Sequence, residues 1–158
     1  MGADGARPYL GRVSEDRWAA WRFLLGEWAG VGGGTPGEAE SGGTRFSLEL
    51  AEQVLVRRNW ARYGDTKDRP AFNHEDLIYV YPHGDAWLAM YFDSEGHVIN
   101  YRATAAESHA IFESDADERG MRYRLRYLAR GAGLDLSFEI APKGGAFAEY
   151  VTARLDRP

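Results

Sequence analysis

Hydrophobic and polar residues alternate with a period of two along most of the chain after Gly26. Such alternation predicts β-strands that have one buried and one solvated face. Glycine, aspartate and proline interrupt the pattern at intervals that suit hairpin turns. The expected strands cover residues 27–34, 44–51, 53–63, 76–81, 86–93, 97–105, 108–114, 121–130, 134–141 and 148–155. We therefore expect an all-β fold, a β-barrel of about ten antiparallel strands in up-and-down order, because closure removes exposed strand edges.

One segment before the strands has a helical pattern instead. Ser14 can cap a helix, and Trp18, Trp21 and Leu25 follow at helical spacing. This spacing predicts one N-terminal helix over residues 14–25, with its tryptophan-rich side against the barrel.

The length of 158 residues accommodates one domain of ordinary size. We assign residues 1–158 to this single domain, with residues 1–13 poorly ordered and residues 27–155 in the barrel. The longest polar connection, residues 64–74, is a candidate lid over the open end.

The turn at residues 93–96, Asp-Ser-Glu-Gly, sets the register of one hairpin. It aligns Tyr91 with Ile99 and Ala89 with Tyr101. Because side chains alternate between the two faces of a strand, several positions should point into the barrel together. The expected inward residues are Trp87, Ala89, Tyr91, Ile99, Tyr101, Ala103, Met121, Tyr123, Leu125 and Tyr127, followed by Leu134, Leu136, Phe138 and Ile140.

Aromatic residues are numerous: five tryptophans, nine tyrosines and seven phenylalanines. An apolar lumen that also carries several hydroxyls suits an aromatic or amphipathic small molecule. The alternative is that the same rings fill a solid core. We take as candidate ligand-binding residues Arg58, Trp60, Tyr79, Trp87, Tyr91, Tyr101, Tyr123 and Tyr127.

The orientation of Arg58 and Trp60 is left open by the pattern. If their side of the strand faces inward, Arg58 could hold a carboxylate deep in the cavity. If it faces outward, Arg58 lies on the surface, stacked on the edge of Trp60.

Lysine and arginine total 19 against 24 aspartates and glutamates, for a formal net charge of -5. This charge argues against nucleic acid and anionic membranes as partners. The absence of cysteine excludes disulfides, thiolate metal sites and a cysteine nucleophile. No apolar leader opens the sequence, so we expect a cytoplasmic protein. The sequence leaves open whether the protein forms a homodimer.

The glycine cluster and the histidines are better explained by structural roles than by binding or catalysis. Gly30, Gly32 and Gly33 lack the strand and helix context of a phosphate-binding loop, and they suit a first strand that bends and closes against the last. The four histidines show no metal-ligand spacing. His74 with Glu75 and Asp76 is read as a solvated turn, and His97 opposite Asp93 as a surface pair. We therefore expect no metal site and see no sign of catalysis.

Residues 23–32 read Phe-Leu-Leu-Gly-Glu-Trp-Ala-Gly-Val-Gly and follow the expected helix. This segment resembles the Gly-x-Trp motif of the calycin superfamily, and within it the nitrobindin-like, lipocalin-like barrels. The resemblance implies a ten-stranded barrel that the helix caps, with Trp28 packed at the closed end.

The same resemblance implies a place for haem. Nitrobindins bind haem through a histidine in a C-terminal segment of the form His-Leu-x-Ala-x-Leu. The corresponding residues 150–155 read Tyr-Val-Thr-Ala-Arg-Leu, which puts Tyr150 at the ligand position. Haem would therefore need Tyr150 as a non-standard axial ligand. Otherwise no cofactor is expected.

The leading hypothesis is non-enzymatic binding of a small hydrophobic or aromatic ligand in the barrel cavity. One alternative is a haem protein that uses Tyr150 or a histidine. Another is a barrel enzyme for a small hydrophobic substrate, with tyrosines and Arg58 as acid and oxyanion groups. The last is a solid barrel that serves as an interaction module.

Overall fold

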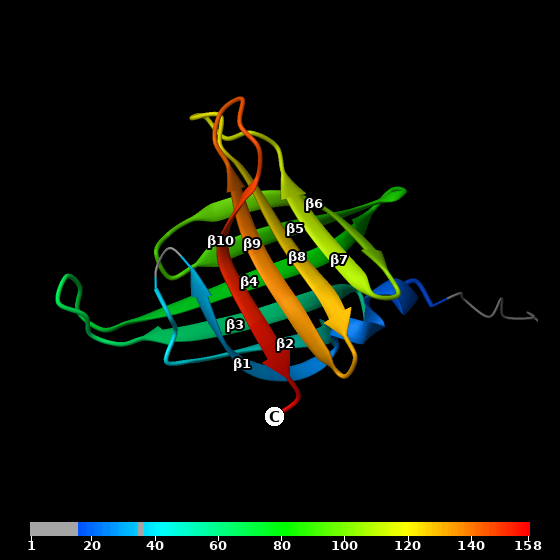
Figure 1. Cartoon of the computed structure of the whole chain (residues 1–158). Helices are drawn as coiled ribbons and strands as arrows, with labels where there is room; N and C mark the ends of the chain where they lie inside the picture. The colour runs from blue at the N-terminus through cyan, green and yellow to red at the C-terminus, as the bar shows by residue number, and fades with distance from the viewer. Residues whose placement is uncertain (1–15, 35–36) are drawn as a thin grey trace, which may run out of the picture.

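The computed structural model describes residues 16–34 and 37–158, so Ser14 and the segment 1–13 lie outside the described residues. Ten antiparallel strands follow one another around a closed barrel (Figure 1). The strands are β1 (Gly26–Gly34), β2 (Ser41–Glu49), β3 (Val54–Tyr63), β4 (Phe72–His83), β5 (Ala86–Asp93), β6 (Val98–Ala106), β7 (His109–Ser114), β8 (Arg122–Arg130), β9 (Gly133–Ala141) and β10 (Ala148–Asp156). The predicted fold class is confirmed.

Glycines form the seam between the first and last strands. Gly30 pairs with Leu155, and Gly32 pairs with Ala153. A Cβ atom at Gly30 would lie 2.0 Å from the carbonyl oxygen of Arg154, far inside any allowed contact. Only glycine lets these two backbones approach so closely, which is the structural role that the sequence predicted.

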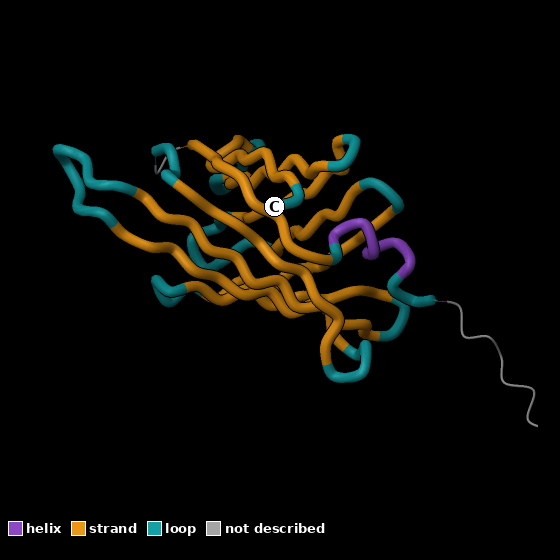
Figure 2. The backbone as a smooth tube through the Cα atoms, turned by 90° about the horizontal axis from the view of Figure 1, so that it is seen from below, coloured by secondary structure: helices purple, strands orange, loops and turns teal. Residues whose placement is uncertain are grey.

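The N-terminal helix is shorter than predicted and of a different type. Helix η1 (Ala19–Leu24) is a 3-10 helix that lies against one end of the barrel (Figure 2). Trp18, Trp21 and Leu24 are spaced by three residues, so a helix with three residues per turn brings all of them to one side. Each is buried, with at most 1% of its surface exposed. The predicted N-terminal helix is thus confirmed, but within the described residues it covers 19–24 of the predicted 14–25 and has 3-10 geometry, which brings its apolar side chains together against the barrel end.

Trp18 and helix η1, together called the plug, are hydrogen-bonded to the strands. The indole Nε1–H of Trp18 donates to the carbonyl oxygen of Glu52, at 2.8 Å, in the turn between β2 and β3. The indole of Trp28 donates in the same way to the carbonyl of Leu24, at 2.7 Å. The plug end of the barrel is thus closed by both packing and backbone contacts, and Trp28 sits there as expected.

Strand β4 begins four residues earlier than predicted, at Phe72. The Phe72 ring stacks on Tyr63 of β3, with ring centroids 4.7 Å apart, and this contact extends the hairpin. The connection 64–74 is consequently shorter than the lid we expected. His74 and Asp76 belong to the strand and face the lumen, so reading them as a solvated turn was wrong.

The barrel interior divides into two halves. The half near η1, called the closed half, is filled by large side chains that include Trp18, Trp21, Trp28, Phe46, Phe112 and Tyr127. The opposite half, called the open half, lies toward the turns that follow β3, β5 and β7. Within the described residues, no helix has the length and apolar character needed to cross a membrane.

Candidate functional site

The open half of the barrel contains a cavity of about 1000 Å³, called the lumen cavity. Inward-facing residues of the strands form its walls, and residues of the turns at the open end form its rim. Its lining includes Tyr91, Tyr101 and Tyr123, which were predicted to face inward together. A volume of this size is in the range of small-molecule sites in proteins.

The two sides of the cavity differ in chemistry. Strands β8 to β10 contribute an apolar wall of Leu125, Leu136, Phe138, Ile140, Val151 and Ala153. Strands β3 to β7 contribute most of the polar groups, called the polar wall, beside a few apolar residues such as Ala61, Phe72 and Ile99. The polar wall consists of Arg57, Asn59, His74, Asp76, Tyr91, Asp93, Tyr101 and Ser114. A molecule in this space would therefore meet hydrocarbon on one side and hydrogen-bonding groups on the other.

An ion pair forms the deepest part of the polar wall. Arg57 Nη1 lies 2.6 Å from Asp76 Oδ1, and both side chains are less than 5% exposed. Asn59 Nδ2 donates to the second carboxylate oxygen of Asp76, at 2.9 Å. Burial opposes the charged form of Arg57, yet the Asp76 carboxylate keeps the pKa of Arg57 above its usual value. Each charge is therefore held in place by the other.

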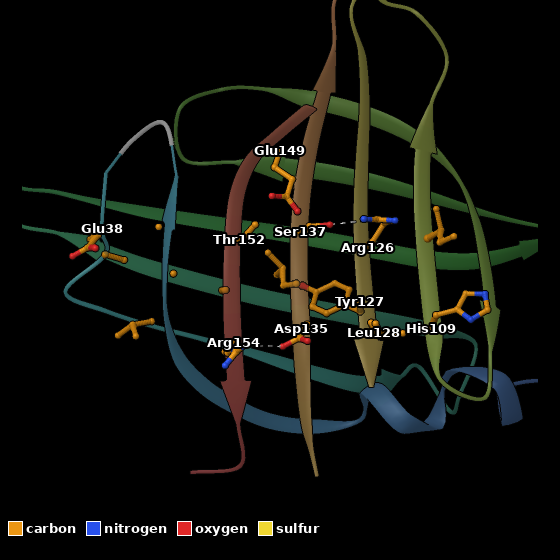
Figure 3. Close-up of a pocket in the computed structure, with 17 residues that line it drawn as sticks. Glu38, His109, Arg126, Tyr127, Leu128, Asp135, Ser137, Glu149, Thr152 and Arg154 are labelled. Atoms are coloured by element: carbon orange, nitrogen blue, oxygen red, sulfur yellow. Dashed lines mark hydrogen bonds and ion pairs between the residues drawn. The ribbon is translucent and has the colours of Figure 1, made fainter. Parts of the chain in front are cut away.

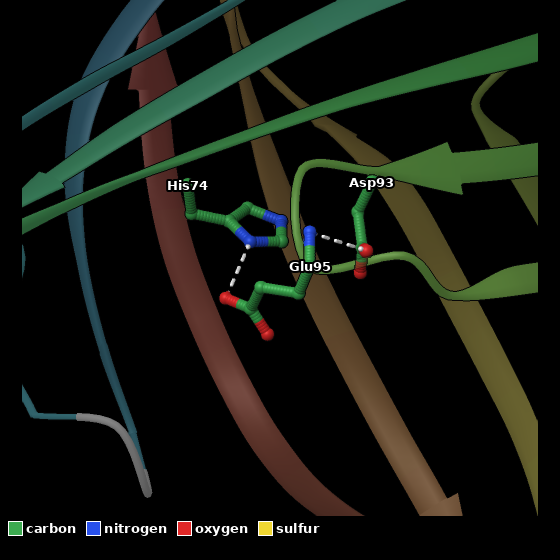
Figure 4. Close-up of side chains that lie close together, drawn as sticks. All are labelled: His74, Asp93 and Glu95. Atoms are coloured by element: carbon green, nitrogen blue, oxygen red, sulfur yellow. Dashed lines mark hydrogen bonds and ion pairs between the residues drawn. The ribbon is translucent and has the colours of Figure 1, made fainter.

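His74 links this pair to the rim. Its Nε2 atom lies 3.2 Å from Asp76 Oδ2, and its Nδ1 atom lies 3.3 Å from Glu95 Oε1 in the turn after β5 (Figure 4). The hydrogen bond to Asp76 raises the pKa of His74, against the effect of burial, and Glu95 adds to the increase. His74 thus lies between a carboxylate of its own strand and a carboxylate of the turn after β5.

Tyr91 and Asp93 continue the network along β5. The Tyr91 hydroxyl donates to Asp93 Oδ2, at 3.0 Å, and lies 3.4 Å from His74 Nε2. Burial and then the Asp76 and Asp93 carboxylates raise the pKa of Tyr91, so the phenol stays protonated. His97 Nδ1 lies 2.8 Å from Asp93 Oδ2. The pairing of His97 with Asp93 is as predicted, but only His97 is on the surface, because the Asp93 side chain is 4% exposed.

One group among the described residues could hold a metal ion. Ligand atoms of His74, Asp93 and Glu95 lie within 4.8 Å of one another (Figure 4). All three side chains also take part in the hydrogen bonds described above.

The predicted ligand-binding residues fall into three places. Tyr91, Tyr101 and Tyr123 line the lumen cavity, and so does Tyr150. Trp87 and Tyr127 also face inward but belong to the closed half, where Trp87 lies 4.7 Å from Trp18 and Tyr127 lies 5.2 Å from Phe46 between ring centroids.

Arg58, Trp60 and Tyr79 face outward. The Arg58 side chain is 53% exposed and lies 3.6 Å from Glu49, while Tyr79 packs edge-on against Phe92 of β5, at 6.4 Å. Trp60 is 48% exposed, and its ring lies over Gly43. Arg58 thus takes the outward alternative, without stacking on Trp60, and its neighbour Arg57 is the inward arginine.

Sequence analysis missed most of the polar wall: Arg57, Asn59, His74, Asp76 and Asp93. Residues 54–56 are all apolar, and residues 57 and 58 are both arginine, so no alternation indicates which side of β3 is buried. His74 was assigned to the connection 64–74, and Asp76 to the start of the next strand, with both read as part of a solvated turn. Had β4 been extended to Phe72, their spacing of two would have placed both in the lumen.

A second hollow lies on the outside of the barrel, across strands β7 to β10 (Figure 3). Its volume is about 920 Å³. Arg126 Nε donates to Ser137 Oγ, at 3.3 Å, and Arg154 lies 4.0 Å from Asp135. These side chains are paired with one another on an exposed surface, so the lumen cavity is the stronger candidate site.

Comparisons with known proteins give a fold and no family. No family model matches the chain, and no curated protein matches it. A solved structure, that of Rv2717c from M. tuberculosis, is similar with a TM-score of 0.62 and 16% sequence identity. The alignment covers 91% of this chain and 98% of that chain. At this identity the similarity supports the ten-stranded barrel architecture alone.

Proposed function

We propose that this protein binds a small amphipathic molecule, with an aromatic or other apolar body, in its lumen cavity, and that it does so without catalysis. The observation that supports this most strongly is the division of the cavity into one apolar and one polar wall. Binding sites for small molecules are concave, mostly apolar and fitted with a few fixed polar groups.

The buried ion pair of the polar wall is not explained by its contribution to the stability of the fold. A buried ion pair contributes little to stability relative to apolar side chains of the same volume. Here Arg57 and Asp76 occupy lumen positions between the closed half and the cavity, where apolar residues would serve the fold equally well. Their presence supports a role in recognising a ligand.

We further infer that the chain is a nitrobindin-like member of the calycin superfamily. Trp28 opens the first strand at the plug end, as the resemblance of residues 23–32 implied. Arg157, near the C-terminus, lies over the Trp28 ring, at 3.5 Å from its centroid. The Gly-x-Trp segment, the capping helix and the strand order support this inference.

Haem does not suit the residues of the lumen. Tyr150 lines the cavity, but within the described residues its hydroxyl has no hydrogen-bond partner that would stabilise a tyrosinate ligand. Both ring nitrogens of His74 already face carboxylates. The buried arginine that could pair with a propionate is engaged by Asp76. We therefore propose an organic ligand in place of haem.

A substitution that fills the cavity tests the proposed function. Ile140 lines the cavity, whereas Leu128 is 52% exposed on the outer face of the preceding strand. We expect Ile140→Trp to weaken binding of the neutral dye N-phenyl-1-naphthylamine by about tenfold or more, which is about 1.4 kcal/mol. Leu128→Trp, the matched control, should leave fluorescence titrations unchanged. Equal affinities in the two variants would contradict binding in the lumen.

A haemin titration tests the alternative directly. We expect the Soret region of the haemin spectrum to be the same in the wild-type protein and in Tyr150→Phe. A wild-type band that Tyr150→Phe abolishes would restore the haem hypothesis in place of ours.

A further inference from the structure

We propose that the ligand of the lumen cavity is anchored by a neutral carbonyl oxygen that accepts hydrogen bonds from Tyr101 and Ser114. This inference rests on the proposed function and specifies the chemical class of its ligand, an aromatic ketone or a related carbonyl compound.

Tyr101 offers a hydroxyl that the protein does not use. The residue is 3% exposed and lines the cavity from β6. No hydrogen bond to this hydroxyl occurs within residues 16–34 and 37–158. A hydroxyl on a residue that is largely buried needs a partner, so it is expected to meet water or a ligand in the cavity.

Ser114 stands beside Tyr101 and offers a second hydroxyl. The two residues are direct partners in the β6–β7 pairing, and Ser114 is 8% exposed. Its Oγ atom accepts a hydrogen bond from the backbone N–H of Tyr123, at 2.9 Å. Because a hydroxyl can accept and donate at once, the Ser114 proton is still available.

The Tyr101 hydroxyl remains a donor in its surroundings. Burial raises the pKa of Tyr101, the positive charge of Arg57 acts against that increase, and the negative charge of Asp76 adds to it. The phenol therefore keeps its proton, as required of a donor to a ligand.

The carboxylates of the polar wall already take part in hydrogen bonds. Asp76 accepts from Arg57 and Asn59, and Asp93 accepts from Tyr91 and lies in contact with His97. Deep in its wall the cavity offers donors instead: the hydroxyls of Tyr101 and Ser114, beside the Nε–H of Arg57, which has no partner among the described residues. A ligand that presents an acceptor oxygen complements them, whereas a ligand that presents only donors does not.

The balance of charge favours a neutral oxygen over a carboxylate. Asp76 already offsets the charge of Arg57 at 2.6 Å. A carboxylate beside Tyr101 would bring a second negative charge close to Asp76 in a poorly solvated space, which is unfavourable. A carbonyl oxygen accepts the same two hydrogen bonds without this penalty.

The opposite wall suits an aromatic body. The rings of Tyr123 and Phe138 lie parallel, with centroids 6.3 Å apart and an interplanar angle of 2°. Leu125 and Ile140 flank them on the same strands. A flat apolar ligand can pack along this surface while its carbonyl faces Tyr101.

Three naphthalene derivatives of similar size separate the outcomes: 2-acetonaphthone, 2-ethylnaphthalene and 2-naphthoate. Calorimetry should show the ketone binding about 3- to 10-fold more tightly than the hydrocarbon, the ratio expected for one net hydrogen bond. Tyr101→Phe should reduce this preference, because only Ser114 then donates, and should leave the affinity for the hydrocarbon unchanged. Tyr79→Phe, which removes a hydroxyl from the outer face, should change neither.

The infrared carbonyl stretch of bound 2-acetonaphthone gives a second readout, expected at lower frequency in the wild-type protein than in Tyr101→Phe. Equal binding of ketone and hydrocarbon, or tighter binding of 2-naphthoate, would overturn this inference and leave the proposed function intact. Failure of all three compounds to bind would overturn both.

Discussion

The two halves of the barrel interior are lined by the same strands, but one half is packed with side chains and the other contains a cavity. In the closed half, inward positions carry tryptophan, phenylalanine and leucine, and the rings of Trp18 and Trp21 lie 4.7 Å and 5.6 Å from Trp87. In the open half, the same alternation carries an arginine, two aspartates and a histidine around a cavity. A strand determines which positions face inward, but the residues placed there decide whether the space is packed or left free.

The comparison also separates stability from function. Large apolar side chains in contact on all sides contribute most of the free energy of folding. Polar side chains around a cavity contribute less to that free energy, and under the proposed function they recognise the ligand. We therefore expect substitutions in the closed half to affect mainly unfolding, and substitutions around the cavity to affect mainly ligand binding unless they leave a buried charge without its partner.

The largest expected effect comes from the plug. Trp21→Ala should lower the free energy of unfolding by about 3–5 kcal/mol, because it leaves a void among fully packed neighbours. Phe138→Ala in the open half should cost about 1–2 kcal/mol, since that ring already borders free space. Urea denaturation of both variants measures the difference. Similar costs would show that the two halves are equally packed.

The buried ion pair should behave as one unit. Arg57→Met leaves the Asp76 carboxylate buried without its partner and should cost about 3–5 kcal/mol. The double variant Arg57→Met/Asp76→Leu should regain most of this loss. Arg58→Met, one residue away on the outer face, should change stability by less than about 0.5 kcal/mol. An equal cost for both arginine variants would contradict the assignment of Arg57 to the lumen.

Substitution by alanine in the glycine seam should destabilise the protein at Gly30 but not at Gly33. Gly30→Ala forces a Cβ against the Arg154 carbonyl and should cost about 1–3 kcal/mol. Gly33→Ala meets no atom closer than 3.6 Å, and that atom belongs to the flexible Glu38 side chain. It should therefore be nearly neutral in thermal unfolding. A tolerated Gly30→Ala would argue against close contact between β1 and β10.

The smallest effect concerns pH. Because the pKa of His74 is raised in the folded state, protonated His74 adds stability that is fully present below its unfolded pKa of about 6.5. This contribution should be lost as the pH rises through the higher folded pKa. Thermal midpoints between pH 6 and pH 9 should therefore fall less in His74→Gln than in the wild-type protein. The exposed outer residue His109 supplies the control, and His109→Gln should retain the wild-type slope.

Much of the architecture could be predicted because its signals are local. The turn at residues 93–96 was enough to set the register of β5 and β6, and alternation of apolar and polar positions identified the inward face of β8 and β9. Strand β3 lacked such a signal. Its apolar start and paired arginines made Arg57 and Arg58 equivalent in the sequence, although one is buried and the other exposed.

The candidate site depended on distant parts of the chain. Arg57, Asp76 and Tyr101 come from three strands, and their spacing in the sequence carries no sign that they meet. The start of β4 was missed because polar residues after Pro70 look like a loop. The contact of Phe72 with Tyr63 extends the strand, and that contact exists only once the hairpin has formed.

The sequence by itself determined the class of fold, the number of strands, the glycine seam and the inward aromatic face, because alternation and turn chemistry act between near neighbours. Only the tertiary structure decided that η1 is a tight plug, that the closed half is solid, and that a buried charged network borders a cavity. Those features depend on burial and on contacts between strands far apart in the chain, and neither is encoded in any single segment.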